Sequence, residues 1–126
     1  MQTEDEGQWI APHLDMEVEA PDESTRILAL RGELDVATVA EFRETLNRLT
    51  EDESISCVCV DLVLVTFIDS TGLMTLLNAL RRMVRRDGRL VLACSNPTVL
   101  RLFEATRTDA TFDIAPTREQ ALASLG

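Results

Sequence analysis

Hydrophobic and polar positions alternate near the start of the chain. Leu14, Met16 and Val18 are separated by acidic residues, which predicts an edge strand. Residues 26–32 (RILALRG) predict a second strand that stops at its final glycine. The connection between them, PDEST at 21–25, is short, so we expect the two strands to form an antiparallel hairpin.

The hydrophobic period changes from two to between three and four after the hairpin. The apolar face of this predicted helix consists of Val39, Phe42, Leu46 and Leu49. The helix is expected to start near Val36, with Asp35 placed to cap it, and to end at the polar run 50–54.

A continuous apolar run follows at 55–65 (ISCVCVDLVLV), as expected for a central strand covered on both faces. A second amphipathic helix begins near Ser70 and breaks at Asp87-Gly88. Beyond it we expect a strand at 89–94, a helix at 97–106, a short strand at 111–114 and a helix from Pro116 to Leu125. Alternating strands and helices favour parallel pairing through helical crossovers. The predicted fold class is α/β, with a mixed, mostly parallel sheet and helices packed against it.

The length of 126 residues predicts a single domain at 12–126, preceded by a flexible tail at 1–11. The first eight residues are acidic, unlike a secretory signal, and the apolar runs are far shorter than the roughly 20 residues of a membrane span. The odd set of cysteines, Cys57, Cys59 and Cys94, lies on strand-like runs. These features together predict a cytoplasmic protein with reduced thiols.

The net charge of −10 limits the partners. All twelve cations are arginines, and the acidic excess argues against binding to nucleic acid or to an anionic membrane. The run RRMVRRDGR at 81–89 falls in the last turns of a helix, where cations offset the helix dipole. A contact with an acidic partner or an intramolecular ion pair remains an alternative use of these arginines.

The usual signatures of an enzyme are missing from the sequence. His13 is the one histidine, and we expect it to be a surface residue. A histidine-centred catalytic triad is therefore not expected. Cys57 and Cys59 are too few ligands for zinc and read as buried structural thiols. Asp61 and Asp69 are the carboxylates in an apolar context that would raise a pKa, and two such residues do not make acid–base chemistry. We expect no catalytic residue, metal or cofactor.

Two strand-to-helix junctions carry short polar residues, at 32–38 (GELDVAT) and 68–72 (IDSTG). If their strands share an orientation, both junctions lie at one edge of the sheet, and Asp35 and Ser70 become neighbours. The plain interpretation is that both junctions supply helix caps. A cap needs only one polar side chain, however, and the junction at 68–72 supplies three, at positions 69–71. The glycine that follows, Gly72, would leave space around the backbone of Ser70. A serine there would be accessible to a kinase.

The residues 60–104, with DSTGL after an apolar strand, together with LRGELD at 30–35, resemble the bacterial anti-sigma-factor antagonists among STAS-domain proteins. The resemblance covers roughly residues 14 to 125. It implies partner switching: the unphosphorylated protein binds an anti-sigma factor that is also a serine kinase using ATP, which frees a sigma factor. Phosphorylation of Ser70 ends the complex, and a serine phosphatase resets the cycle. Thr71 is an adjacent alternative phosphorylation site.

The resemblance also implies a partner-binding surface. Its residues would be Asp35, Thr38, Asp69, Ser70, Thr71, Gly72 and Met74. The chain departs from the family at Val63-Leu64, where Ser-Gly is frequent, and at residues 106–108, where Thr-Gly-Leu is frequent. Two other functions stay open: a STAS interaction or ligand- and nucleotide-sensing module that does not switch, and a small enzyme.

Overall fold

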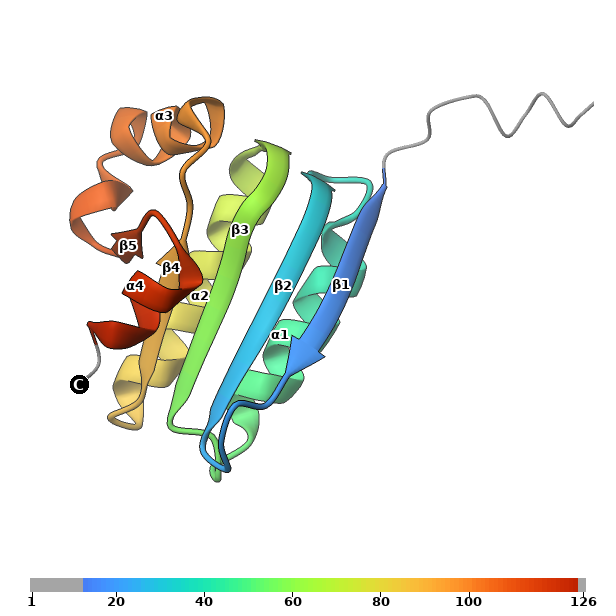
Figure 1. Ribbon diagram of the computed structural model, residues 1–126. Coiled ribbons are helices and arrows are strands. Elements are labelled where there is room, and N and C mark those ends of the chain that lie inside the picture. Colours follow the sequence, from blue (N-terminus) through green and yellow to red (C-terminus); the bar gives the residue numbers. More distant parts are fainter. Residues whose placement is uncertain (1–12, 125–126) are drawn as a thin grey trace, which may run out of the picture.

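A five-stranded sheet organises the chain, and the computed structural model describes residues 13–124 (Figure 1). The strands are β1 (Leu14–Glu19), β2 (Thr25–Leu34), β3 (Cys57–Ile68), β4 (Arg89–Ala93) and β5 (Asp113–Ala115). The helices are α1 (Val39–Glu51), α2 (Ser70–Arg85), α3 (Pro97–Ala105), the 3₁₀ helix η2 (Thr108–Ala110) and α4 (Arg118–Ala123). Strand order follows chain order; β1 is antiparallel to β2, and the other pairs are parallel. The predicted fold class and hairpin are confirmed.

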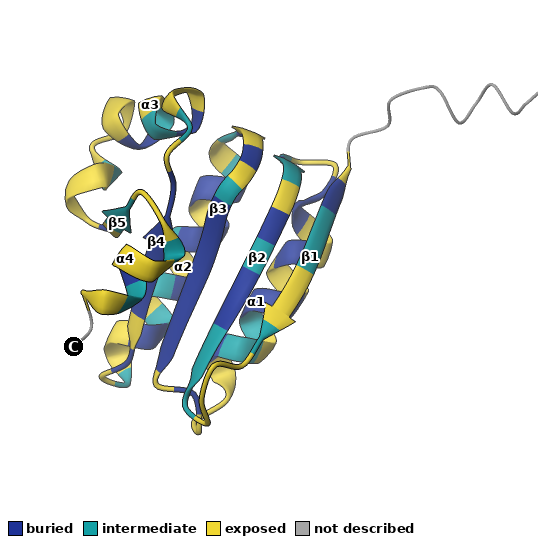
Figure 2. Cartoon of the chain, viewed as in Figure 1, coloured by how far each residue is buried: buried dark blue, intermediate teal, exposed yellow. Residues whose placement is uncertain are grey.

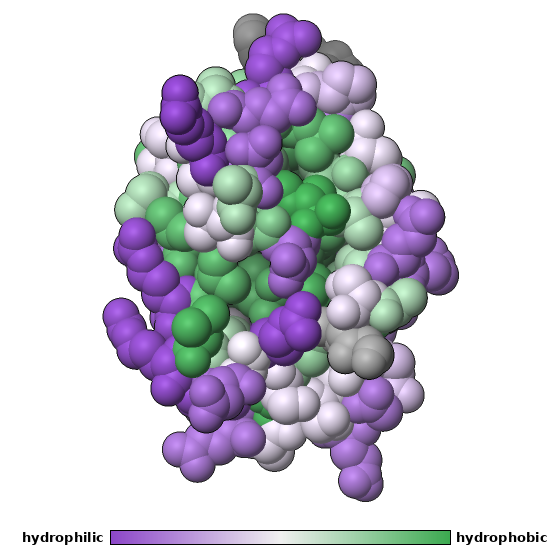
Figure 3. Space-filling model, turned by 90° about the vertical axis from the view of Figure 1, so that its left-hand side faces the viewer, coloured by the Kyte–Doolittle hydropathy of each residue, from purple (hydrophilic) through white to green (hydrophobic). Residues whose placement is uncertain are grey.

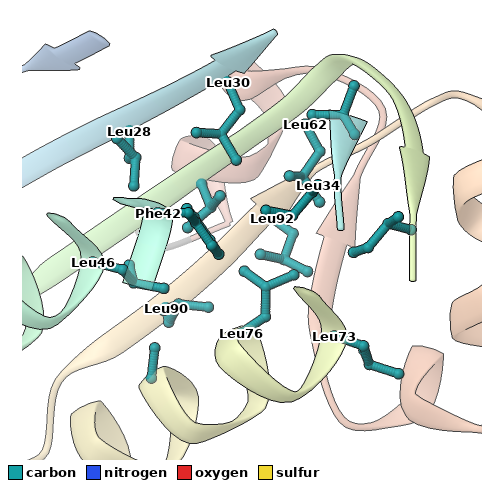
Figure 4. Packing of buried hydrophobic residues seen from close by; sticks show 14 of the residues in the cluster. Leu28, Leu30, Leu34, Phe42, Leu46, Leu62, Leu73, Leu76, Leu90 and Leu92 are labelled. Atoms are coloured by element: carbon teal, nitrogen blue, oxygen red, sulfur yellow. The ribbon is translucent and has the colours of Figure 1, made fainter. Parts of the chain in front are cut away.

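The main core lies between the sheet and the helices α1 and α2, which cover one of its faces (Figure 1). Alternate residues of β2, such as Leu28 and Leu30, point toward these helices and meet Phe42 of α1. Figure 4 shows Leu76 of α2 reaching the same cluster from the other helix. This packing follows from the two periods of the sequence, since a period of two buries one strand face and a period near 3.6 buries one helix stripe.

The opposite face of the sheet is partly covered by α4 (Figure 1). Here Ala121 packs against the strand residues Ile27, Cys57, Cys59, Val91 and Ala93. All three cysteines are free and buried, which confirms the predicted burial of Cys57 and Cys59. Burial raises the pKa of the Cys59 thiol to about 12, with the Asp61 charge adding to the effect, so this cysteine stays protonated.

An arginine fastens α4 to the sheet. Arg118 Nε lies 2.8 Å from Asp61 Oδ2 on β3, and Arg118 Nη1 lies 2.8 Å from Glu19 Oε1 on β1. Hydrogen bonds to Glu19 and Asp61 raise the pKa of Arg118 above its ordinary value. The buried Asp61 carboxylate therefore serves as an ion-pair partner of Arg118.

The structure corrects two predicted boundaries. Strand β2 continues through Gly32 to Leu34, because Gly32, with φ of 123°, sits where a Cβ would lie 2.2 Å from the His13 carbonyl oxygen. The glycine therefore permits close pairing with β1 and does not end the strand. Helix α1 begins at Val39 instead of Val36, and Asp35 does not cap it: the Asp35 carboxylate accepts a hydrogen bond from the Ala37 amide within the preceding turn.

Two further expectations concern the ends of the chain and the membrane. The predicted tail at 1–11 lies outside the described residues, as does the last residue of the predicted final helix, Leu125. None of the described helices combines the length and the apolar composition that a bilayer crossing requires. The lone histidine, His13, is exposed as predicted and contacts Asp15 at 2.9 Å.

Candidate functional site

The two polar junctions do meet at one edge of the sheet. Strands β2 and β3 are parallel and end together, with Leu34 opposite Ile68. The backbone then continues the pairing, since the Asp69 amide donates to the Leu34 carbonyl at 3.1 Å. As a result, the loop of residues 35–38 lies beside the first turn of α2. The upper ends of β2 and β3 carry exposed and intermediate positions, whereas their middles are buried (Figure 2).

Asp69 is the central residue of this edge. Its Oδ1 atom caps α2 by accepting hydrogen bonds from the Thr71 amide at 2.9 Å, the Thr71 hydroxyl at 2.6 Å and the Gly72 amide at 3.2 Å. Its Oδ2 atom accepts from the Val36 amide at 3.1 Å, across to the other loop. One carboxylate therefore joins both junctions and satisfies amides at a helix start.

The pKa of Asp69 is lowered, contrary to the expectation that an apolar context would raise it. Partial burial does raise the pKa, but hydrogen bonds from the Thr71 hydroxyl and from the amides of Gly72, Thr71 and Val36 more than offset this effect. Asp69 is therefore an ionised cap at neutral pH, and the edge of the sheet carries a fixed negative charge.

Ser70 is the first residue of α2 and is exposed. Within residues 13–124, no side-chain hydrogen bond involves its hydroxyl, whereas the Thr71 hydroxyl is held by Asp69 and half-buried. The same exposed side of α2 presents Met74 one turn later, with 48% of its surface accessible. The geometry thus makes Ser70 the more accessible of the two hydroxyls for a visiting enzyme.

Two other residues of the expected partner surface are built into the scaffold. Thr38 is buried, and its hydroxyl donates to the Glu33 carbonyl at 2.8 Å and accepts from the Asp35 amide at 3.0 Å. Gly72 is buried too, and a Cβ there would lie 2.8 Å from Leu34 Cγ. Gly72 thus allows α2 to pack closely on the end of β2. Thr38 and Gly72 therefore support the site from inside the fold and do not form its exposed surface.

Two exposed apolar residues at this edge were not singled out from the sequence. Val36 is 72% exposed beside Asp69, and Phe67 is 45% exposed near the end of β3. Phe67 lies beyond the predicted strand of residues 55–65 but inside the longer β3 of the structure, and Val36 lies three residues before α1 begins. Together with Met74, they add exposed apolar surface near this end of the sheet. Among the described residues, no group of three or more potential ligands could hold a metal ion.

The mixed sheet, with two helices on one face and an exposed serine at the start of the second, is the arrangement of a STAS domain. The STAS domain family model matches residues 15–121, and the chain belongs to that family. The anti-sigma-B factor antagonist of Staphylococcus aureus is 36% identical over 75 residues, which cover 60% of this chain and 68% of the relative. The chain is therefore a homologue of anti-sigma factor antagonists.

Solved structures agree on the fold. A crystal structure of an anti-sigma factor antagonist from Mycobacterium paratuberculosis superimposes with a TM-score of 0.82 at 24% identity, covering 89% of this chain and 93% of the other. The anti-sigma factor antagonist SpoIIAA in its unphosphorylated form gives a TM-score of 0.76 at 23% identity, covering 88% and 96%. The Bacillus cell fate determinant SpoIIAA in its phosphorylated form gives a TM-score of 0.70 at 22% identity, covering 89% of this chain and 100% of the other.

Proposed function

We propose that this protein is a cytoplasmic anti-sigma-factor antagonist that acts by partner switching, with Ser70 as its phosphorylation site. In the unphosphorylated state it binds an anti-sigma factor that is also a serine kinase and that binds ATP itself. Phosphorylation of Ser70 releases the partner, and a serine phosphatase restores the binding state. The observation that carries the proposal is the exposed Ser70 hydroxyl, which makes no side-chain hydrogen bond within residues 13–124 and lies next to Asp69, the residue that links the two loops.

Electrostatics explains why a phosphate at Ser70 would act at the interface. A phosphoserine adds about −1.5 to −2 charges at neutral pH. The amides of Thr71, Gly72 and Val36, which could otherwise stabilise the phosphate, already donate to Asp69. The new charge therefore adds to an ionised carboxylate instead of being neutralised. A partner that covers the edge must desolvate both charges, and about 1.4 kcal/mol of such a penalty is enough for a tenfold loss of affinity.

The remaining residues divide into contacts and supports. Val36, Phe67 and Met74 offer the apolar contact area around Ser70. Asp35 and Asp69 present carboxylates that suit a partner with basic side chains. Thr38 and Gly72 hold the loop and the helix start in place. Binding thus requires no rearrangement of the domain, and release requires only the charge at Ser70.

The experiment that tests the site is phosphate mapping. The purified protein is incubated with ATP and with each anti-sigma-factor kinase encoded in its own genome, and intact mass and peptide fragmentation are recorded. We expect one phosphate, on Ser70, and no phosphate on Ser70→Ala. The variant Ser56→Ala, which removes another exposed hydroxyl, should be phosphorylated like the unmodified protein. Phosphate found on Thr71 or elsewhere, with Ser70 unmodified, would contradict the proposal.

A STAS module that does not switch remains the alternative, and the same variants separate the two functions. A module of that kind would bind its partner equally well as Ser70→Ala and as Ser70→Asp. A partner-switching antagonist would keep binding as Ser70→Ala and lose it as Ser70→Asp.

A further inference from the structure

A second surface lies along the C-terminal half of α2, away from Ser70. There α2 borders a groove of about 600 Å³ shared with η2 and β5. Its apolar lining comes from Leu77, Leu80, Val84 and Leu90. Val84 is 60% exposed, so it adds to the apolar surface of the groove. Figure 3 shows this side of the molecule, where apolar residues gather between charged ones.

Arginines border this groove. Arg81, Arg85 and Arg89 line it together with the apolar residues, and Arg89 also pairs with Asp113 at 3.2 Å. We call this surface the arginine-flanked groove. Arg81 lies eleven residues after Ser70 on α2, a rise of about 16 Å along the helix. The groove is therefore separate from the Ser70 edge, and nothing about it depends on the proposed phosphorylation.

Arg81 and Arg85 also face a second hollow, of about 350 Å³, between α1 and α2. Arg43 and Arg82 complete its basic lining, and no carboxylate is among the described residues that line it. Arg82 is held in place by Asn47 Oδ1 at 2.7 Å and by Thr50 Oγ1 at 3.2 Å. Arginines on both sides of α2 thus concentrate positive charge on one helix.

This concentration runs against the composition of the chain. The net charge is −10, yet α2 (Ser70–Arg85) contains three arginines and neither aspartate nor glutamate. Cations offset the helix dipole only when they lie in the last turn of the helix. The dipole therefore does not account for Arg81, nor for the exposed apolar residues beside Arg81. A positive stripe on a negative protein steers acidic partners to one place.

We propose that the arginine-flanked groove binds an acidic amphipathic helix of a protein partner. Apolar side chains of that helix would lie on Leu77, Leu80 and Val84, and its carboxylates would pair with Arg81 and Arg85. Helices that bind in grooves use apolar anchors at spacings of three and four residues, which matches an elongated lining along α2. The charge complementarity selects for acidic flanks and against basic ones.

Extended polyanions fit this surface less well. Glu104, Asp109 and Asp113 line the neighbouring hollow, and Asp113 also lines the arginine-flanked groove itself, where it pairs with Arg89. A nucleic acid or an anionic membrane that spread from Arg81 over the neighbouring surface would meet these carboxylates too, and their charges would repel it. A single helix can place its carboxylates on Arg81 and Arg85 and its apolar side chains on the rest of the groove, where Asp113 is already paired with Arg89.

The test uses a designed probe and the full-length protein. The probe is a fluorescein-labelled peptide of about 18 residues, with leucines at helical spacing and glutamates on both flanks. A matched peptide carries lysines in place of the glutamates. Affinities are measured by fluorescence anisotropy, and the binding site is mapped by amide chemical shifts of ¹⁵N-labelled protein.

We expect the glutamate peptide to bind with shifts confined to residues 77–90 and 108–113, and the lysine peptide to bind at least tenfold more weakly. Arg81→Glu/Arg85→Glu should weaken binding of the glutamate peptide by about tenfold. The control Arg48→Glu/Arg101→Glu changes the net charge equally at exposed positions outside the groove and should leave the affinity within about twofold. Melting temperatures confirm that both variants are folded.

Several results would overturn the proposal. They are absence of binding by the glutamate peptide, equal binding of the two peptides, no effect of Arg81→Glu/Arg85→Glu, and shifts located elsewhere. Tighter binding of phosphatidylglycerol vesicles or of a single-stranded oligonucleotide through the same arginines would assign the surface to a different ligand. Concentration-dependent self-association that Arg81→Glu/Arg85→Glu abolishes would assign it to a second copy of the chain.

Discussion

The Val36 amide donates a hydrogen bond to Asp69 Oδ2 at 3.1 Å, between loops that lie 33 residues apart in the chain. The same carboxylate caps α2 through Thr71 and Gly72. Asp69 therefore fixes the position of Ser70 relative to the loop of residues 35–38. In the proposed function, the kinase and the binding partner would both recognise this edge.

Replacement of Asp69 should destabilise the domain. Asp69→Ala removes the α2 cap and leaves the Val36 amide without its acceptor, so we expect a loss of about 1–2 kcal/mol in the free energy of unfolding. Urea denaturation followed by circular dichroism measures this loss. Asp109→Ala, at an exposed position in η2, is the control and should change the stability by less than about 0.5 kcal/mol. An equal effect of both variants would show that the carboxylate does not tie the two loops together.

The contribution of Asp69 should depend on pH. Its pKa is lower in the folded protein than the ordinary value of 3.8, so the folded state favours the ionised form. The stabilisation is then fully present above the unfolded-state pKa and is lost as the pH falls through the lower folded-state pKa. We expect the stability difference between the unmodified protein and Asp69→Asn to be constant from neutral pH to about pH 5 and to shrink below about pH 4. A difference that grows on acidification would contradict the assigned direction of the pKa shift.

Gly72 should not tolerate a side chain. An added Cβ would lie 2.8 Å from Leu34 Cγ and 3.1 Å from Ile68 Cγ1, and Leu34 is fully buried. We expect Gly72→Ala to cost about 1–3 kcal/mol by overpacking, although alanine is the better helix former. Asn78→Ala, exposed on the same helix, should leave the melting temperature unchanged or slightly higher. A stabilised Gly72→Ala would mean that α2 does not pack closely on β2.

Arg118 should matter more than an exposed arginine. Arg118→Met leaves Asp61, whose side chain is 12% exposed, without its ion-pair partner. We expect a loss of about 2–3 kcal/mol, below the full cost of a buried unpaired charge because Arg118 itself is 26% exposed. Arg31→Ala breaks a pair in which both side chains are exposed, and this control should cost less than about 1 kcal/mol. Similar losses of stability in the two variants would contradict the conclusion that Arg118 links α4 to the sheet.

The sequence was sufficient for the elements and for their meeting at one edge. Alternation at Leu14 and Met16 and helical spacing at Phe42 and Leu46 each report burial of one face, which the fold reproduces. Parallel strands with helical crossovers must end at the same edge, so the meeting of the two junctions, seen at Val36 and Asp69, followed from topology. These predictions rest on local periods and on chain connectivity, which a single sequence contains.

Tertiary contacts account for what the sequence did not reveal. Gly32 resembles a strand end until the His13 carbonyl of the neighbouring strand is placed against it. Asp61 looks like an isolated carboxylate until Arg118, 57 residues later, is folded onto it. Phe67 is an aromatic residue near the end of β3, and only the folded structure shows that it is 45% exposed. Each property depends on residues distant in sequence, which no local pattern encodes.

The central claim is that a phosphate on Ser70 ejects the partner, and a binding titration tests it most directly. The affinity of the cognate anti-sigma-factor kinase is measured by isothermal titration calorimetry for the unmodified protein, the Ser70-phosphorylated protein, Ser70→Ala and Ser70→Asp. We expect the unmodified protein and Ser70→Ala to bind alike, and the phosphorylated protein to bind at least tenfold more weakly, which corresponds to about 1.4 kcal/mol. Equal affinity of the phosphorylated and unmodified proteins would contradict the claim.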